Sequence, residues 1–226
     1  MIKEKYIHLC KTAADNQSAI DRLYEIVKVL RVECPWDRVQ THESLRPGML
    51  EEAYETVDAI NNQDMVNLRE ELGDVLLQVV FHSILGEEVS NFDLKDVINE
   101  ECEKMIRRHP HVFLQENTNN TPKSIDKVLE KWENIKEKER GETKTASRLA
   151  KVPRALPALT RAYKVQKKAA DVGFDWDDVS GAFDKVHEET RELTECCKAE
   201  TVDKKALEEE LGDLLFSVVN VSRFLG

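Results

Sequence analysis

Five acidic residues crowd into two short segments of the first half of this chain. Glu51, Glu52 and Glu55 lie in LEEAYE, and Glu71 and Asp74 lie in EELGD. Side chains three positions apart share one face of a helix, so Glu52 pairs with Glu55 and Glu71 with Asp74. Two such pairs on antiparallel helices present four hard oxygen ligands, which suit Mg²⁺ or Mn²⁺. The spacing therefore predicts a divalent-metal site between two helices.

The same acidic pattern returns in the second half of the sequence. Four carboxylates repeat the arrangement: Glu189, Glu192, Glu210 and Asp213. Glu51 and Glu188 are 137 positions apart, and Glu71 and Glu210 are 139 apart. A shared order with a nearly constant offset indicates duplication of one helical unit.

Acidic pairs are also common on solvated helix faces, but here the surrounding helix is strongly apolar. Glu71 and Asp74 interrupt a run of Leu and Val, where like charges resist burial unless a cation compensates them. Gly73 and Gly212 stand beside the acidic pairs in both copies. Glycine inside a helix costs roughly 1 kcal/mol against alanine, so its recurrence indicates a close approach of another helix or of a ligand.

Apolar periodicity predicts the helices that position these carboxylates. Apolar residues recur at steps of three and four over 65–80 and again over 207–219. Asp64 and Asp203 precede these two runs and are predicted N-caps. Further helices are expected over 17–32, 44–61, 94–107, 122–139, 157–171 and 178–198. No strand pattern competes with them, so the sequence predicts an all-α fold.

The segments between the helices predict two domains. The stretch 109–123 is expected to be a loop, and 141–156 a linker, which leaves domains over 1–140 and 157–226. Two acidic helices cannot bury both of their apolar faces alone, whereas four helices across a two-fold axis can. A homodimer is therefore expected. Trp36 and Trp176, at equivalent places in the copies, are expected to pack at helix entries rather than stack on a base.

The net charge, the apolar stretches, the cysteines and the missing motifs argue against several classes of protein. A net charge of −11 argues against binding a nucleic-acid polymer. The most apolar stretch, 75–81, is too short to span a membrane, and five cysteines without a CxxC pair predict a cytoplasmic protein. Neither copy has the Glu-x-x-His pair of a di-iron site, and the GxxxxGK[ST] phosphate loop is absent.

The motifs together resemble the MazG family of nucleoside triphosphate pyrophosphohydrolases. In order they are CPWDRVQTHESL, LEEAYETVDAI, EELGDVLLQVVFHS, RRHPHVF, KWENIKEKE, VGFDW and a second EELGD. The resemblance covers nearly the whole chain from about residue 19. It implies two tandem all-α helical bundles that assemble as a dimer. It also implies Mg²⁺-dependent hydrolysis of NTPs and dNTPs to nucleoside monophosphate and pyrophosphate, with Mn²⁺ as a possible substitute.

The resemblance also implies residue roles. The metal ligands would be Glu52, Glu55, Glu71 and Asp74 in the first copy and Glu189, Glu192, Glu210 and Asp213 in the second. The catalytic carboxylates would be Glu51, Glu52, Glu188 and Glu189, with Glu51 and Glu188 supporting or activating water. The triphosphate would be held by Arg107, Arg108, Lys136 and Lys185. Alternatively, Arg107 and Arg108 are two positive charges at the C-terminus of a helix, where they stabilise the helix dipole.

One departure from the family pattern concerns the second domain. Tandem relatives usually continue past the second acidic helix with a basic helix, whereas this sequence stops at Gly226. We therefore expect domain 157–226 to lack its last basic helix, and the first half to carry most of the hydrolysis. The alternative is a non-catalytic helical module that binds nucleotides or a partner protein.

Overall fold

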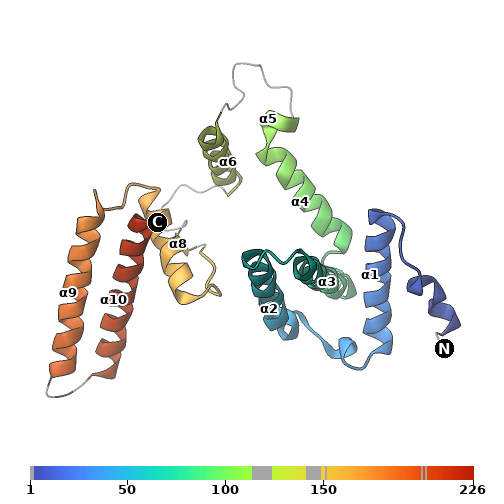
Figure 1. Ribbon diagram of the computed structural model, residues 1–226, viewed down its shortest axis with the longest axis horizontal. Coiled ribbons are helices and arrows are strands. Elements are labelled where there is room, and N and C mark those ends of the chain that lie inside the picture. The colour runs from blue at the N-terminus through green and yellow to red at the C-terminus, as the bar shows by residue number, and fades with distance from the viewer. Residues whose placement is uncertain (1–2, 114–123, 141–148, 151, 200, 202) are drawn as a thin grey trace. The chain divides into compact units, whose positions relative to one another are not determined.

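The computed structural model describes residues 3–113, 124–140, 149–150, 152–199, 201 and 203–226. Within these ranges every regular element is a helix and no strand occurs, which confirms the predicted all-α class for this part of the chain. The chain forms two compact units, Met1–Pro122 and Lys123–Gly226 (Figure 1). The predicted boundaries at 140 and 157 stay a prediction, and residues 141–148 lie outside the described part.

The first unit is a small helical assembly centred on one long helix. Its elements are η1 (Glu4–Cys10), α1 (Asn16–Glu33), η2 (Asp37–Val39), α2 (His42–Asn61), α3 (Met65–Glu88), α4 (Leu94–Arg108) and α5 (Pro110–Phe113). Both α1 and α2 pack against α3 (Figure 1). The buried core between them consists of Val27, Leu45, Val80, Phe81, Ile84 and Leu85.

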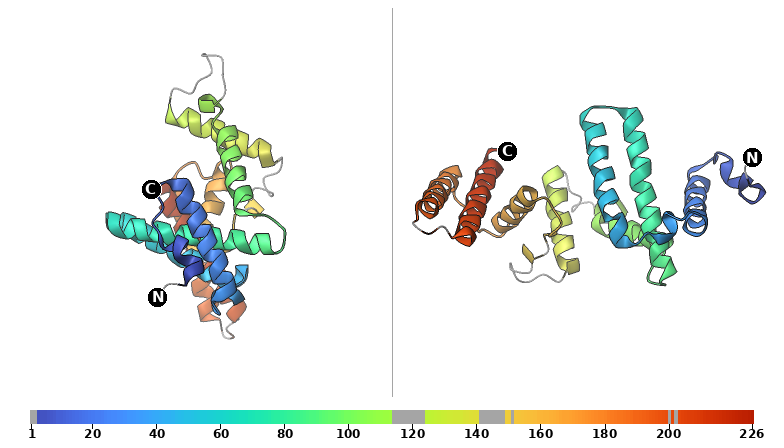
Figure 2. Two further views of the ribbon diagram at one scale, coloured as in Figure 1. Left: turned by 90° about the vertical axis from the view of Figure 1, so that its right-hand side faces the viewer. Right: turned by 90° about the horizontal axis from the view of Figure 1, so that it is seen from below.

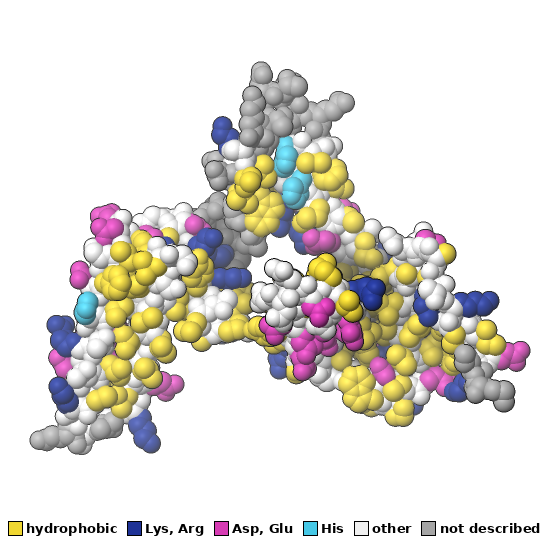
Figure 3. Space-filling view, viewed as in Figure 1, with side chains coloured by type: hydrophobic (Ala, Val, Ile, Leu, Met, Phe, Trp, Pro, Cys, Tyr) yellow, Lys and Arg dark blue, Asp and Glu magenta, His cyan; other side chains and the backbone are white. Residues whose placement is uncertain are grey.

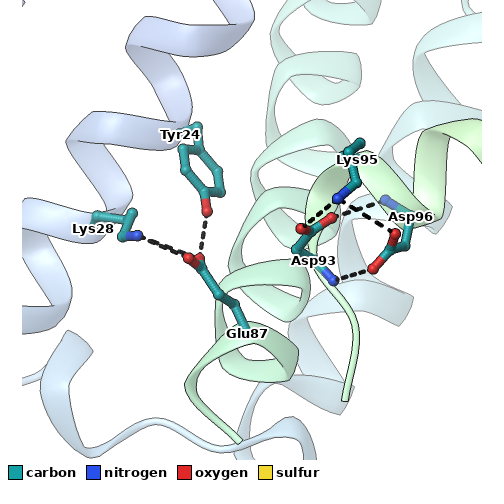
Figure 4. Close-up of polar contacts among 6 residues, drawn as sticks. All are labelled: Tyr24, Lys28, Glu87, Asp93, Lys95 and Asp96. Carbon is teal, nitrogen blue, oxygen red and sulfur yellow. Dashed lines mark hydrogen bonds and ion pairs between the residues drawn. The ribbon is translucent and has the colours of Figure 1, made fainter. Parts of the chain in front are cut away.

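Ion pairs fix α1 against the C-terminal part of α3. Glu87 of α3 accepts hydrogen bonds from the Tyr24 hydroxyl and, at 3.1 Å, from the Lys28 ammonium (Figure 4). About one turn later on α1, the Arg31 guanidinium donates to both carboxylate oxygens of Glu88 at 2.8 and 2.6 Å. With a rise of about 1.5 Å per residue, Glu87 lies about 20 Å along α3 from Asp74. These ion pairs with α1 therefore lie far from the end of α3 that carries Glu71 and Asp74.

The α2–α3 hairpin begins and turns at capped helix ends. Thr41 and Ser44 exchange backbone and side-chain hydrogen bonds at the start of α2, which forms a capping box. After α2, Gln63 takes a left-handed conformation with φ 55°, and Asp64 then accepts the amide hydrogens of Val66 and Asn67. The predicted N-cap role of Asp64 is confirmed, and the tight turn sends α3 back along α2.

The second unit repeats this hairpin. Its elements are α6 (Ile125–Arg140), α8 (Ala158–Ala170), α9 (Val179–Lys198) and α10 (Lys204–Leu225). Helix α10 packs against both α8 and α9, and the α9–α10 pair lies side by side in Figures 1 and 2 as α2 and α3 do. Asp178 caps α9 by accepting the Ser180 amide hydrogen at 2.7 Å, and Asp203 caps α10 through the Lys205 amide at 2.9 Å. The predicted N-cap role of Asp203 is thus confirmed.

Three expectations need correction. Residues 110–113 form a helical turn rather than loop, because Pro110 has the φ angle and the missing amide hydrogen that suit a first helical position; residues 114–123 lie outside the described part. Trp36, at the N-cap of η2, is 62% exposed and is therefore not the packed aromatic expected at this helix entry, whereas Trp176 lies against Gly181. Helix α3 also runs on to Glu88, beyond the periodic segment 65–80.

No described helix combines the length and the apolar composition that crossing a bilayer requires.

Candidate active site

Three carboxylates meet on the α2–α3 hairpin. Glu52 and Glu55 of α2 and Glu71 of α3 each place one oxygen within 4.8 Å of the others; these residues are called the first acidic cluster below. Acidic side chains gather over α2 and α3 in the space-filling view (Figure 3). Asp74 is not in this set of three, although its charge is the strongest carboxylate influence on Glu52. The antiparallel hairpin thus brings together side chains from both predicted pairs.

The first cluster is electrostatically strained. Partial burial raises the pKa of Glu52, and the neighbouring charges of Asp74, Glu55 and Glu71 raise it further. Burial and the charge of Glu55 likewise raise the pKa of Glu71. In the described part of the chain, no ion pair joins a Lys, Arg or His to Glu52, Glu55, Glu71 or Asp74. Crowded oxygen donors without a protein cation are the donor set that Mg²⁺ or Mn²⁺ fits.

The α9–α10 hairpin carries a second acidic cluster. Glu189 of α9 and Glu210 and Asp213 of α10 each place an oxygen within 4.8 Å of the others. Glu192 is outside this set, yet after burial its charge contributes most to raising the pKa of Glu210. Glu189 is nearly inaccessible, at 4% exposure. The second hairpin therefore holds its carboxylates in the same general place as the first, with one of them deep in the unit.

A pocket adjoins the second cluster. It has a volume of about 550 Å³, and its lining includes the carboxylates Glu189 and Asp213 together with Phe174, Trp176 and Gln166. Gln166 is 7% exposed; its amide nitrogen donates to the Phe216 carbonyl at 2.7 Å, whereas its Oε1 has no hydrogen-bond partner. The aromatic walls and the acidic edge belong to one continuous cavity within the second unit.

Comparison with known proteins places these features in a family. The model of the "MazG nucleotide pyrophosphohydrolase domain" matches residues 40–113 and 180–225, which contain both acidic clusters. The chain belongs to the MazG family. The match in two segments is in accord with the repeat in the sequence.

Curated relatives extend this similarity over most of the chain. The chain is 46% identical to the "Nucleoside triphosphate pyrophosphohydrolase" of Escherichia coli over 92% of its own length and 78% of that protein. It is also 46% identical to the "Nucleoside triphosphate pyrophosphohydrolase/pyrophosphatase MazG" of Thermotoga maritima, over 91% of its own length and 76% of that protein. A crystal structure of a mazG-related protein from Thermotoga maritima matches 52% of this chain and 98% of that one, with 27% identity and a TM-score of 0.44.

The remaining predicted site residues of this MazG-family chain lie on several elements. Glu51 and Glu188 are exposed beside their clusters on α2 and α9. Arg107 and Arg108 occupy the last turn of α4. Lys136 belongs to α6, and its side chain lies outside the described part. The triphosphate role assigned to these basic residues stays a prediction.

Lys185 forms ion pairs with two carboxylates of its own helix, beyond the triphosphate role that the family resemblance implies. Its ammonium lies 2.6 Å from Glu189 and 3.3 Å from Glu188, and the hydrogen bond to Glu189 is the main cause of its raised pKa. The spacing of three and four residues on one helix is a signal that predicts both pairs. Gly48 occupies the equivalent position in the first copy, 137 residues earlier, so the first cluster has no such lysine.

The glycines beside the acidic pairs have no close neighbour among the described residues outside their own helix turns. A Cβ atom at Gly73 or Gly212 would meet nothing within 4 Å. Close packing of another helix of the same unit is therefore not the reason for either glycine among the described residues. The expected approach of a ligand or of a second chain stays a prediction.

Proposed function

We propose that this MazG-family enzyme hydrolyses nucleoside triphosphates to nucleoside monophosphate and pyrophosphate at its two acidic clusters. The observation that carries the proposal is the set of three oxygens from Glu52, Glu55 and Glu71 within 4.8 Å of one another on two packed helices. Among the residues that the structure describes, no cationic side chain forms an ion pair with them. We assign the metal-ligand role to these residues and to Asp74. The corresponding ligands in the second unit are Glu189, Glu192, Glu210 and Asp213.

A divalent cation, Mg²⁺ or Mn²⁺, supplies charge neutralisation for the phosphate oxygens and lowers the pKa of bound water. Glu52 would hold the cation, and the exposed Glu51 next to it would accept the proton of the attacking water. Glu189 and Glu188 would play the same parts in the second unit. A carboxylate within the cluster stays available as a ligand because the repulsion that raises its pKa is relieved when a cation binds.

Basic side chains are required as well, because a triphosphate brings several negative charges to an acidic site. We assign this role to Arg107, Arg108, Lys136 and Lys185. Guanidinium groups bind phosphate oxygens in a bidentate manner, which favours the two arginines as the partners of the leaving pyrophosphate.

In the second unit, we place the nucleoside in the pocket beside the cluster. Its volume of about 550 Å³ lies within the range of small-molecule sites, and Phe174 and Trp176 offer aromatic surface to a base. A triphosphate bound at Glu189 and Asp213 would extend its nucleoside into this cavity, because both carboxylates form part of the lining.

We also propose that the chain works as a homodimer. Both helices of the first hairpin expose large apolar side chains, namely Leu50, Tyr54 and Val57 of α2 and Leu72 and Leu76 of α3. Pairing two such hairpins across a two-fold axis buries these faces in a four-helix arrangement. The cysteines of the chain are all free, which supports a reducing compartment such as the cytoplasm.

The direct test is pyrophosphate release from a panel of NTPs and dNTPs, with and without Mg²⁺. We expect release that stops when EDTA is added and resumes with Mg²⁺ or Mn²⁺. A matched control is Glu52→Gln, which keeps the side-chain shape and removes a charged ligand. Nucleotide binding without pyrophosphate release from any member of the panel would favour the alternative of a non-catalytic binding module.

A further inference from the structure

The two acidic clusters differ in one charged side chain. In the second cluster, the Lys185 ammonium lies 2.6 Å from Glu189, a residue that we propose as a metal ligand. At the equivalent position the first cluster has Gly48. The second cluster therefore already contains a counter-ion supplied by the protein, whereas no ion pair among the described residues brings a Lys, Arg or His to the first.

The partners in this ion pair differ in their freedom to move. The Glu189 side chain is 5% exposed, while that of Lys185 is 41% exposed. Glu189 is thus fixed by the surrounding helices, and the flexible lysine stem can turn its ammonium toward solvent or a ligand. Of the two, Lys185 is the group that leaves when another cation approaches.

We infer that Lys185 is an internal counter-ion of the second cluster that competes with the metal and couples metal binding to triphosphate binding. With no nucleotide present, a divalent cation must displace the ammonium from Glu189 or bind against its repulsion, so it binds the second cluster more weakly than the first. When a triphosphate binds, the released ammonium pairs with phosphate oxygens, and metal and nucleotide strengthen each other's binding. This inference rests on the proposed function, because it takes both clusters as metal sites.

The test uses Mn²⁺ alone as the probe, titrated into the full chain without nucleotide and followed by electron paramagnetic resonance of the free ion. We expect a tighter class of sites that Glu52→Gln removes and a weaker class that Glu210→Gln removes. Lys185→Met keeps the apolar stem and removes the charge, so it should tighten the weaker class by about tenfold. Lys185→Arg keeps the charge and should leave that class weak.

The first cluster offers the reciprocal experiment. Gly48→Lys introduces the missing cation and should weaken the tighter class, while Gly48→Ala is the matched control. A Cβ at residue 48 would lie 3.0 Å from the flexible end of Gln78, so a small shift of that side chain admits either substitution. Circular dichroism melts establish that each variant is folded.

The coupling is measured by repeating the Mn²⁺ titration with a non-hydrolysable triphosphate. In the unchanged chain the nucleotide should tighten the second class, and in Lys185→Met this gain should shrink. Equal Mn²⁺ affinity at both clusters of the unchanged chain, or no effect of a folded Lys185→Met variant, would overturn the inference and leave the proposed function standing. Absence of Mn²⁺ from both clusters would instead overturn the metal assignment itself.

Discussion

The α2–α3 and α9–α10 hairpins carry equivalent carboxylates on equivalent helices but differ in the residues around them. Both hairpins have aspartate-capped second helices, at Asp64 and Asp203, and a glycine beside the acidic pair. The first cluster has no paired cationic side chain in the described part of the chain, whereas Lys185 reaches into the second. The duplication has kept the arrangement of the carboxylates and changed how their charge is balanced.

A second difference lies farther along the hairpins. In the first, the Nδ1 atoms of His42 and His82 are 2.7 Å apart and the two rings are stacked. The equivalent positions in the second, 137 and 139 residues later, are Val179 and Val221. A titratable contact in one copy thus corresponds to an apolar pair in the other. The two units should respond differently to metal, to partner chains and to pH.

The largest difference is expected in catalysis. Glu52→Gln with Glu55→Gln should lower pyrophosphate release by roughly 10²- to 10³-fold or more, the range for losing a preorganised electrostatic group. Glu189→Gln with Glu192→Gln should leave most of the activity, because we expect the first cluster to bind metal without displacing a lysine. The two double variants are assayed side by side in the same Mg²⁺ concentration. Retained activity in a folded first variant and loss in the second would place the working site on α9–α10.

The proposed dimer interface is the second feature in which we expect the two hairpins to differ. The exposed large apolar residues of the first hairpin lie on both helices, while in the second hairpin α9 contributes only Phe183 to that set and α10 the rest. The double substitution Leu72→Glu with Leu76→Glu should therefore separate the proposed dimer. Light scattering at micromolar concentration should then give half the mass of the unchanged chain. The matched change at Leu211 and Leu215 should leave the dimer intact. If only the variant changed at Leu211 and Leu215 dissociated, the interface would have to be assigned to α9–α10 instead.

A smaller effect is expected from pH. Burial and the neighbouring charge of His42 hold the pKa of His82 below its ordinary value of 6.5. The unfolded chain then takes up a proton at higher pH than the folded chain, so stability is complete above pH 6.5 and falls as the pH drops toward the folded pKa. Below that window both ring nitrogens of His82 carry protons, and its positive charge lies against the stacked ring of His42.

The measurement is a series of thermal melts between pH 7.5 and pH 5, with hydrogen exchange to assign the change to a unit. As the pH is lowered, the protection of amide hydrogens from exchange should decrease more in α2 and α3 than in α9 and α10. Replacing His42 and His82 with the valines of the second copy should flatten this dependence. An unchanged pH profile in that double variant would show that the imidazole pair does not set the response.

The fold was predictable where local signals agree with packing. Apolar periodicity and the capping residues Asp64 and Asp203 located the main helices, because an amphipathic helix with a cap needs little tertiary information. The helical turn at 110–113 was missed because it is one turn long and too short for periodicity. The exposure of Trp36 is not predictable from periodicity either, because Trp36 precedes η2, a 3-10 turn of three residues.

The candidate site was predictable in part for a similar reason. Spacing of three residues within a helix indicated which carboxylates share a face, and the repeat indicated that two hairpins carry them. Neither signal indicated that Asp74 and Glu192 lie outside the two sets of three carboxylates whose oxygens are within 4.8 Å of one another. That detail depends on how the two helices of each hairpin are rotated against each other. The pocket beside Gln166 was not foreseen, since its walls come from segments far apart in the sequence.

The smallest expected effect concerns the caps of the acidic helices and tests whether the two scaffolds are equivalent. Asp64 accepts two amide hydrogens, from Val66 at 3.1 Å and Asn67 at 3.0 Å, whereas Asp203 accepts one, from Lys205 at 2.9 Å. Replacing an N-cap aspartate with alanine costs about 1 kcal/mol, so both variants should be modestly destabilised, with Asp64→Ala the larger loss because two donors lose their acceptor. Chemical denaturation of the full chain, with hydrogen exchange in α3 and α10, measures each loss. A larger loss at Asp203 would show that the second acidic helix depends more on its cap than on its contacts with α8 and α9.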